Sequence, residues 1–164
     1  MISNENIFDE VQNVRNTVME KILQNQNILK LVAIPSPDAL SQNDIENVGA
    51  LIDNYIWFKP KVFEATVKDV KCFLLMDINV TATRNRSNYS DIKIIFRVIV
   101  HNDLFELDNG KARSYEIAKH LTDMFQSEKG SWIGRCEFLS CYQLETPFAY
   151  QGIEVAFSVT DFKG

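Results

Sequence analysis

The order of hydrophobic patterns along the chain predicts an α+β fold, with a mainly antiparallel four-stranded sheet packed on one face by helices. Two stretches of helical period come first, followed by two strand-like runs, a further helix and two more strand-like runs. The strand-like runs alternate between apolar and other residues, which is typical of strands with one buried face.

Length and composition favour a single domain over residues 1–164. The chain has 164 residues, of which 46% are hydrophobic, so it can build a substantial core. It contains no internal repeat, no low-complexity tract and no long linker. We divide the domain into an N-terminal helical segment, residues 1–33, and an α+β core, residues 34–164.

The first helix is predicted over residues 5–24, with Ser3 as its N-cap. Apolar residues recur there at helical spacing, namely Ile7, Val11, Val14, Val18 and Ile22. A short additional helical turn is expected over residues 28–32.

Pro35 and Pro37 interrupt the helical pattern and predict a turn or extended segment. After it, Ser41-Gln-Asn-Asp44 resembles a capping box, with Asp in place of Glu. We therefore expect a second helix whose apolar positions are Ile45, Val48, Leu51, Ile52 and Tyr55. A short extended piece over residues 57–63 follows, around Pro60.

Two strands are predicted over residues 72–80 and 91–101 from their period of two. The segment between them, residues 81–90, is polar, carries two arginines and is longer than a tight hairpin needs. We interpret it as an extended loop that projects from a hairpin.

The second half of the chain predicts a turn, a helix and a strand pair. Asn109-Gly110 closes an Asp-rich turn over residues 103–110. A helix is expected over residues 111–126, with Lys111, Arg113 and Glu116 away from its buried face. Gly130 and Gly134 bracket a turn, and strands are expected over residues 135–144 and 150–160.

Charge and targeting signals limit the class of protein. The net charge of −5 argues against a general nucleic-acid binder, which needs concentrated Lys and Arg. The first ten residues lack the pattern of a secretory signal, and no apolar run approaches the roughly 20 residues of a membrane span. We therefore expect a soluble protein made in a cytoplasm, with its three cysteines as free thiols.

Catalytic and metal-binding patterns are missing from the sequence. The two histidines, His101 and His120, have no evident convergent partners. Cys136 and Cys141 lie five apart, which places them on opposite faces of a regular strand. Asp103, Glu106 and Asp108 do not have the ligand spacing of a calcium loop. We expect no enzyme activity, no metal and no cofactor.

Contact residues are therefore the site residues that we predict. They lie in three exposed places: the 81–90 loop, the acidic turn, and the turn before the last strand pair. The residues are Arg84, Arg86, Tyr89, Phe105, Asp108 and Trp132. An exposed Trp is a common anchor of a protein interface, and the alternative for Trp132 is that it seals the edge of the core.

Three segments carry a resemblance to a known family: Pro37-Asp-Ala-Leu40, the run from Leu104 to Ala118, and the run from Trp132 to Leu139. Together with the order of elements, they resemble the small neck proteins of long-tailed bacteriophages, and more narrowly the tail terminator or tail-completion proteins. The resemblance covers about residues 29–162. The predicted first helix and the 81–90 loop depart from that pattern.

The resemblance implies a structural virion protein that forms a ring, usually a hexamer. Such a ring caps the head-proximal end of the tail tube, ends tail polymerisation and joins to the head connector. The implied partners are other copies of the chain, the tube protein, the connector and, in a contractile tail, the sheath protein. The implied location is the virion neck, after assembly in the bacterial cytoplasm.

A ring subunit needs two surfaces that meet head-to-tail. We expect the second face of the sheet to meet a neighbour or to line a lumen through which DNA passes without specific binding. The residues expected on that face are Asp77, Asn79, Arg97, His101, Glu137, Gln143 and Glu154.

Two alternatives remain open from the sequence. The first is a head-tail connector or stopper protein, which is also a small α+β ring subunit. The second is a small enzyme or ligand-binding domain, for which His101, Asp103 and Cys141 would be the first residues to consider.

Overall fold

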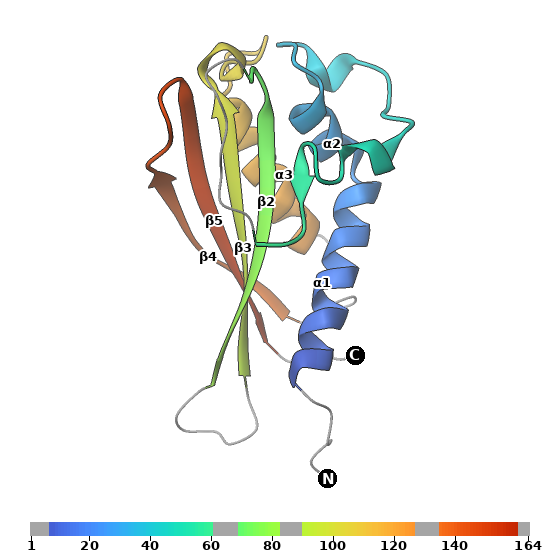
Figure 1. The fold of residues 1–164 in the computed structure, drawn as a ribbon, viewed down its shortest axis with the longest axis vertical. Helices are drawn as coiled ribbons and strands as arrows, with labels where there is room; N and C mark the ends of the chain where they lie inside the picture. The colour runs from blue at the N-terminus through green and yellow to red at the C-terminus, as the bar shows by residue number, and fades with distance from the viewer. Residues whose placement is uncertain (1–6, 61–68, 83–89, 127–134, 161–164) are drawn as a thin grey trace.

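The computed structural model describes residues 7–60, 69–82, 90–126 and 135–160. These residues form a single mixed sheet with helices on one face (Figure 1). The three α-helices are α1 (Ile7–Gln24), α2 (Gln26–Ala33) and α3 (Arg113–Gln126), with 3-10 turns at η1 (Ala39–Ser41), η2 (Val48–Leu51) and η3 (Asn102–Leu104). The strands are β1 (Ile56–Trp57), β2 (Cys72–Ala82), β3 (Ser90–His101), β4 (Arg135–Leu144) and β5 (Tyr150–Thr160).

The sheet has five strands in the order β1-β2-β3-β5-β4, so the expectation of four antiparallel strands is only partly right. The four long strands pair antiparallel, as predicted, but β1 adds a parallel strand beside Leu74 and Leu75. The sequence predicted an extended piece near Trp57. A strand of two residues is too short to show a period, so its pairing could not be predicted.

The core lies between the sheet and the helices. Its strand residues come from alternate positions, such as Leu74, Ile94, Phe96, Val155 and Phe157, all less than 2% exposed. The helices contribute Val14, Val18 and Ile22 from α1, Ile28, Leu29 and Leu31 from α2, and Ile117, Leu121 and Phe125 from α3. We call this side of the sheet the helix-covered face.

We call the opposite side the helix-free face. One row of residues crosses the four long strands on this face: Leu75, Arg97, Glu154 and Tyr142. Arg97 contacts Asp77 at 3.1 Å and Glu154 at 3.5 Å on this face. Near β1 the helix-free face also has a small buried apolar cluster: Trp57, Phe73, Leu75, Ile99 and Tyr150. Both faces are therefore partly buried, not one alone.

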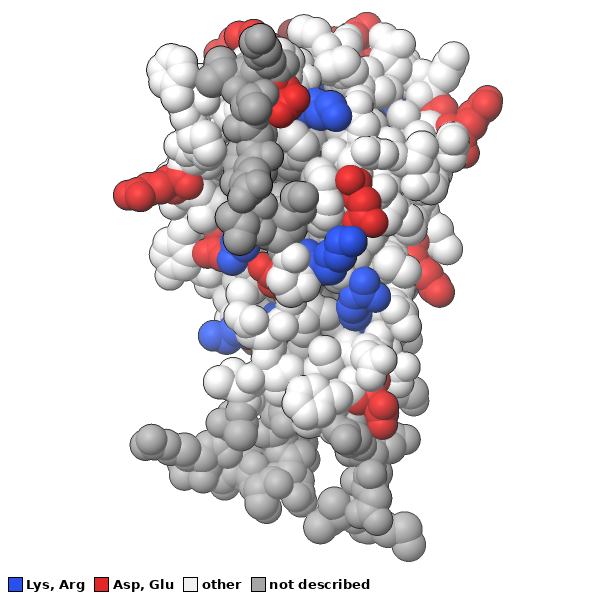
Figure 2. Space-filling model, in the orientation of Figure 1, with Lys and Arg blue, Asp and Glu red and all other residues white. Residues whose placement is uncertain are grey.

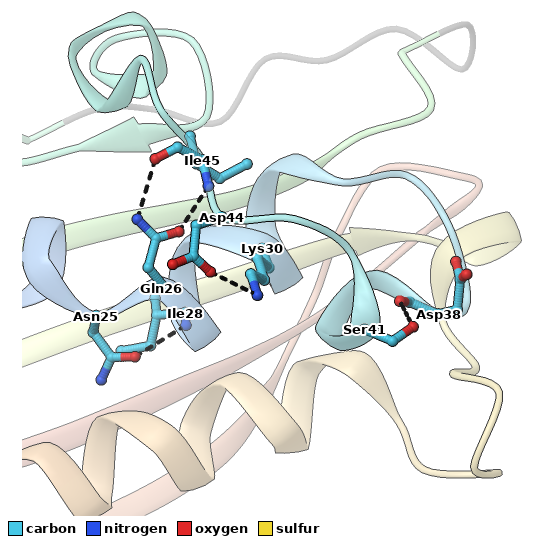
Figure 3. Close-up of polar contacts among 8 residues, drawn as sticks. All are labelled: Asn25, Gln26, Ile28, Lys30, Asp38, Ser41, Asp44 and Ile45. Carbon is cyan, nitrogen blue, oxygen red and sulfur yellow. Dashed lines mark hydrogen bonds and ion pairs between the residues drawn. The ribbon is translucent and has the colours of Figure 1, made fainter.

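The prediction of a second helix beginning near Asp44 is wrong. The segment forms only η2, because polar side chains of α2 bind it in an irregular path (Figure 3). Gln26 accepts a hydrogen bond from the Ile45 N–H at 2.8 Å and donates one to the Ile45 carbonyl at 3.1 Å. Lys30 forms an ion pair with Asp44 at 2.9 Å. Ile45 therefore has its backbone groups satisfied without a helix.

Other helix boundaries agree closely with the prediction. The short turn expected near Ile28 is α2, capped by the Asn25 side chain, which accepts from the Ile28 N–H. Helix α3 begins at Arg113, two residues later than expected. The expected N-cap Ser3 lies outside the described residues, and of the 81–90 loop only residues at its ends are described, within β2 and β3.

Arg113 is the main departure from the predicted helix pattern. Its side chain was expected away from the core, yet Arg113 is 1% exposed. The guanidinium donates to four backbone carbonyls, those of Leu104 (2.8 Å), Leu31 (2.7 Å), Ile34 (3.1 Å) and Ser36 (2.7 Å). Burial lowers the pKa of the guanidinium, and the electrostatic interaction with Cys72 partly raises it again. Arg113 thus joins α3 to the end of α2 and to the proline-containing turn.

Glu116 was also expected away from the core and is also buried. Its carboxylate lies 3.7 Å from Lys111 and 3.9 Å from Lys119, so two ammonium groups compensate the buried charge.

No helix within the described ranges is both long and apolar enough to cross a membrane.

Candidate protein interface at the β4 edge

Strand β4 forms one edge of the sheet (Figure 1). It pairs with β5 along its whole length, and no other described strand pairs with its outer side. An edge of this kind presents unpaired N–H and C=O groups, and native proteins usually shorten, charge or cover such edges. In β4 the ten-residue edge is neither short nor strongly charged and its pairing is interrupted by a single bulge, so it is a candidate contact surface.

A β-bulge at Leu139 divides β4 into two parts. Phe138 lies opposite Phe157 and Ser140 lies opposite Ala156, so Leu139 is the extra residue. Residues directly opposite each other in an antiparallel pair share a face. Phe138 therefore faces the helices, and beyond the bulge the alternation is reversed, so that Tyr142 lies on the helix-free face.

Because of the bulge, two predictions about the faces of β4 are wrong. Cys136 lies opposite Val159 and Cys141 opposite Val155, so both thiols are on the helix-covered face and not on opposite faces. Gln143 lies opposite Ile153, also on the helix-covered face, although it was expected on the other. The registers leave Asp77, Asn79, Arg97, His101, Glu137 and Glu154 on the helix-free face, as expected.

Large apolar side chains gather on this edge and on the hairpin that follows it. The exposed large hydrophobic residues of the described ranges are Phe8, Val70, Val80, Tyr115, Phe138, Leu139, Tyr142 and Phe148. Half of them lie between Phe138 and Phe148. Tyr142 is 64% exposed and Phe148 is 84% exposed. Such clustering marks a binding surface more often than single exposed residues do.

Phe138 connects this surface to the core. Its ring lies 6.1 Å from that of Phe157, edge-on, and Phe157 in turn packs against Phe125 (4.6 Å) and Phe96 (6.0 Å). The three inner rings are almost fully buried, whereas Phe138 is 49% exposed. The aromatic core is thus open to solvent at β4, where a partner could complete its packing.

A polar contact joins β4 to α3 at this edge. The Gln143 amide donates to the Tyr115 hydroxyl at 2.8 Å. Beneath it is a cavity of about 60 Å³, lined by Phe105, Ser114, Tyr115, Gln143, Gln151, Gly152 and Ile153. A cavity of this size is far below the roughly 300–1,000 Å³ of small-molecule sites.

The cysteines of β4 have no features of a reactive thiol. Burial raises the pKa of Cys136 to about 12 and also raises the pKa of Cys141. A raised pKa reduces the thiolate fraction, and the thiolate is the nucleophilic form.

Of the six predicted contact residues, the structure describes two. Phe105 ends η3 and lines the small cavity, and its carbonyl accepts from the Arg113 N–H at 2.8 Å. Asp108 is exposed in the acidic turn, and its N–H donates to the Pro37 carbonyl at 3.0 Å. Arg84, Arg86, Tyr89 and Trp132 lie outside the described residues.

Phe138, Leu139 and Tyr142 were missed as contact residues. The available signal was the pair Phe138-Leu139, because two adjacent large apolar residues in a strand point to opposite faces. One of them then faces away from the helices, where only the small cluster near β1 is buried.

The three residues considered for an enzyme do not converge. His101 lies on the helix-free face, with its ring 5.2 Å from that of Tyr150, whereas Cys141 lies on the helix-covered face of another strand. The His101 Nδ1 atom accepts from the Asp103 N–H at 3.1 Å, which is turn chemistry. No group of three or more His, Cys, Asp or Glu side chains within the described ranges could hold a metal.

Within the described residues, the fold and the β4 edge define a small α+β protein whose most evident candidate binding feature is an open strand edge. The chain belongs to the YomW family, a phage-derived family whose model matches residues 25–159. That match spans α2 to β5 and leaves out α1. No curated protein and no solved structure matches the chain.

Proposed function

We propose that this protein is a structural assembly protein of a phage tail, and specifically a tail terminator. In this proposal, copies form a ring on the head-proximal end of the tail tube, which ends tube polymerisation and provides a surface for the head connector. In a contractile tail the ring also contacts the last sheath ring.

The observation that carries the proposal is the long unpaired β4 edge with Phe138, Leu139 and Tyr142 exposed on it. A subunit that works by assembly needs such a surface, whereas an enzyme needs a cleft with convergent polar groups. Membership of a phage-derived family supports the same class of function. The resemblance of three segments, Pro37–Leu40, Leu104–Ala118 and Trp132–Leu139, to neck proteins supports the narrower assignment.

Light scattering over a range of concentrations, with and without the cognate tail tubes, tests the proposal. We expect either a stable ring, such as a hexamer, or a monomer that assembles on tube ends. Tubes polymerised with the protein present should be capped at one end and should stop growing. A protein that stays monomeric and leaves tube length unchanged would contradict the assignment.

A connector or stopper protein is the nearest alternative, and the same assay separates it. A connector ring assembles in solution but binds the head portal and not the free tube. Rings that leave tube ends uncapped and bind portal complexes would therefore replace the terminator assignment with the connector assignment.

A further inference from the structure

The sheet has a second open edge, on β2. Strand β1 pairs only with Leu74 and Leu75, so the rest of β2, residues 76–82, has β3 as its only partner among the described strands. Asn79, Val80 and Thr81 are exposed there. This β2 edge and β4 lie at opposite sides of the sheet (Figure 1).

The two edges match in direction. Each neighbouring pair from β2 through β3 and β5 to β4 is antiparallel, so β4 runs opposite to β2. Rotation about a ring axis keeps the direction of every strand relative to that axis. Strand β4 of one copy therefore meets β2 of the next in the antiparallel sense, which is the pairing that the long strands already use.

The two edges also match in the character of their faces. On the helix-covered face, one register row runs through Ile78, Ile94, Phe157 and Phe138, and the next runs from Val80 to Cys136. On the helix-free face, the same edges carry Asp77 and Asn79 on β2 and Glu137 and Ser140 on β4. Because the side-chain period is two, edge-to-edge pairing places apolar residues beside apolar residues and polar beside polar.

We propose that β4 of one copy pairs antiparallel with residues 76–82 of β2 in a second copy, so that the sheet continues from subunit to subunit. The proposal rests on the proposed function, since this contact joins two different surfaces head-to-tail and a head-to-tail contact closes only as a ring. The pairing satisfies the open backbone groups of both edges and removes Phe138 and Val80 from water. Pairing of β4 with itself would instead be isologous and would leave the β2 edge open.

Two single substitutions test the contact, one on each edge. Val80→Lys changes the β2 edge and Phe138→Glu changes the β4 edge, and each buries a charge at the contact. We expect each variant alone to need a roughly tenfold or more higher concentration for half-assembly than the wild type. Native mass spectrometry and light scattering give the measurement.

Mixing the two variants is the decisive step. The proposed pairing includes the register that places Phe138 of one copy opposite Val80 of the next, so the carboxylate introduced by Phe138→Glu meets the ammonium introduced by Val80→Lys. The following contact around the ring joins two unchanged edges. The equimolar mixture should therefore assemble as rings that alternate the two variants, in which every changed contact is an ion pair.

Matched controls exist for both substitutions. Val70→Lys makes the same change at a valine of similar exposure, 42% against 36% for Val80, two residues before β2 begins. Phe8→Glu makes the same change at an exposed phenylalanine of α1, outside the apolar cluster of β4 and outside both paired strands. Both controls should assemble as the wild type does.

The outcomes separate the contact from the function. If V80K assembles normally, or if the mixture of the two variants fails to assemble, the proposed pairing is wrong while a wild-type ring leaves the proposed function standing. If the controls fail as well, the loss is not specific to the edges and the pairing is also wrong. If F138E does not fold by circular dichroism, V80K alone decides. A wild type that never assembles, even on tubes, contradicts the proposed function itself.

Discussion

Arg113 shows how one residue can hold distant segments together. Four of its five N–H donors bind four carbonyls from three places: the end of α2, the turn after it and η3. A guanidinium stays charged even when burial lowers its pKa, so these are charge-assisted hydrogen bonds. Without Arg113, the carbonyls of Leu31 and Leu104 would lose a buried donor, whereas those of Ile34 and Ser36 would keep the Ser36 and Ala39 N–H groups as donors.

Replacing Arg113 with Met should therefore destabilise the protein strongly. We expect a loss of about 3–5 kcal/mol in the free energy of unfolding, because four charge-assisted hydrogen bonds, two of them buried, are lost at once. Urea denaturation followed by circular dichroism measures the change. Arg15→Met is the matched control, since Arg15 donates to a single backbone carbonyl, that of Phe58 at 2.8 Å, and should cost about 1 kcal/mol. Equal losses in the two variants would contradict this role.

Sequence reasoning failed at Arg113 for an identifiable reason. A helical pattern assigns a charged residue to the solvent side, because burial of an unpaired charge is costly. The compensating carbonyls come from residues far earlier in the chain, at separations of 77, 79 and 82. Nothing local to α3 could have indicated them.

At the scale of elements, Gln26 determines the path of the segment after η1. Its amide contacts both backbone groups of Ile45, as a neighbouring strand would, and thereby keeps residues 44–47 out of a helix. The close-up in Figure 3 shows this contact beside the ion pair of Lys30 with Asp44.

Gln26→Ala should lower the free energy of unfolding by about 1–2 kcal/mol, because two partly buried backbone groups lose their partner. Thermal and urea denaturation measure the loss. Gln24→Ala, at the exposed last position of α1, should change stability by less than about 0.5 kcal/mol. If Gln26→Ala is as mild as this control, water replaces the amide and the contact does not set the path.

The long strands were the most predictable elements. The bounds of β4 and β5 agree with those predicted from the alternation of apolar residues, and β2 and β3 extend the predicted strands by one or two residues. The capping-box pattern at Ser41 misled because the same side chains make a local turn: the Ser41 hydroxyl donates to the Asp38 carbonyl at 2.8 Å.

The candidate site was less predictable than the fold. Phe138 and Tyr142 are exposed because β4 is the outermost strand of the sheet, and the order of strands in a sheet is not encoded locally in the sequence. The bulge at Leu139 then reversed the expected face of Gln143 and Cys141. No glycine marks this bulge, so a period of two read through it gave the wrong faces for the residues beyond.

At the scale of the whole molecule, the distribution of charge bears on DNA. On the face shown in Figure 2, Lys and Arg side chains are interspersed with Asp and Glu, and neither sign forms a large continuous patch. The chain as a whole carries a net charge of −5. That face has no concentrated positive surface to release counterions from a duplex.

We therefore predict no measurable binding of duplex DNA at about 150 mM salt, either by the free protein or by the assembled ring. Fluorescence anisotropy of a labelled duplex, repeated across a salt series, provides the measurement. Binding that weakens steeply as salt rises would show that assembly brings Lys and Arg together into a basic surface. That result would contradict passage of DNA without binding.

The four bonds of Arg113 also constrain the order in which the molecule can be completed during its synthesis. The carbonyls of Leu31, Ile34 and Ser36 leave the ribosome 77 to 82 residues before the guanidinium that binds them. At about 5–20 residues per second, that interval is roughly 4–16 s. During that interval these carbonyls lack the guanidinium, although those of Ile34 and Ser36 can already accept from the Ser36 and Ala39 N–H groups. The end of α2 is thus translated early and joined to α3 late.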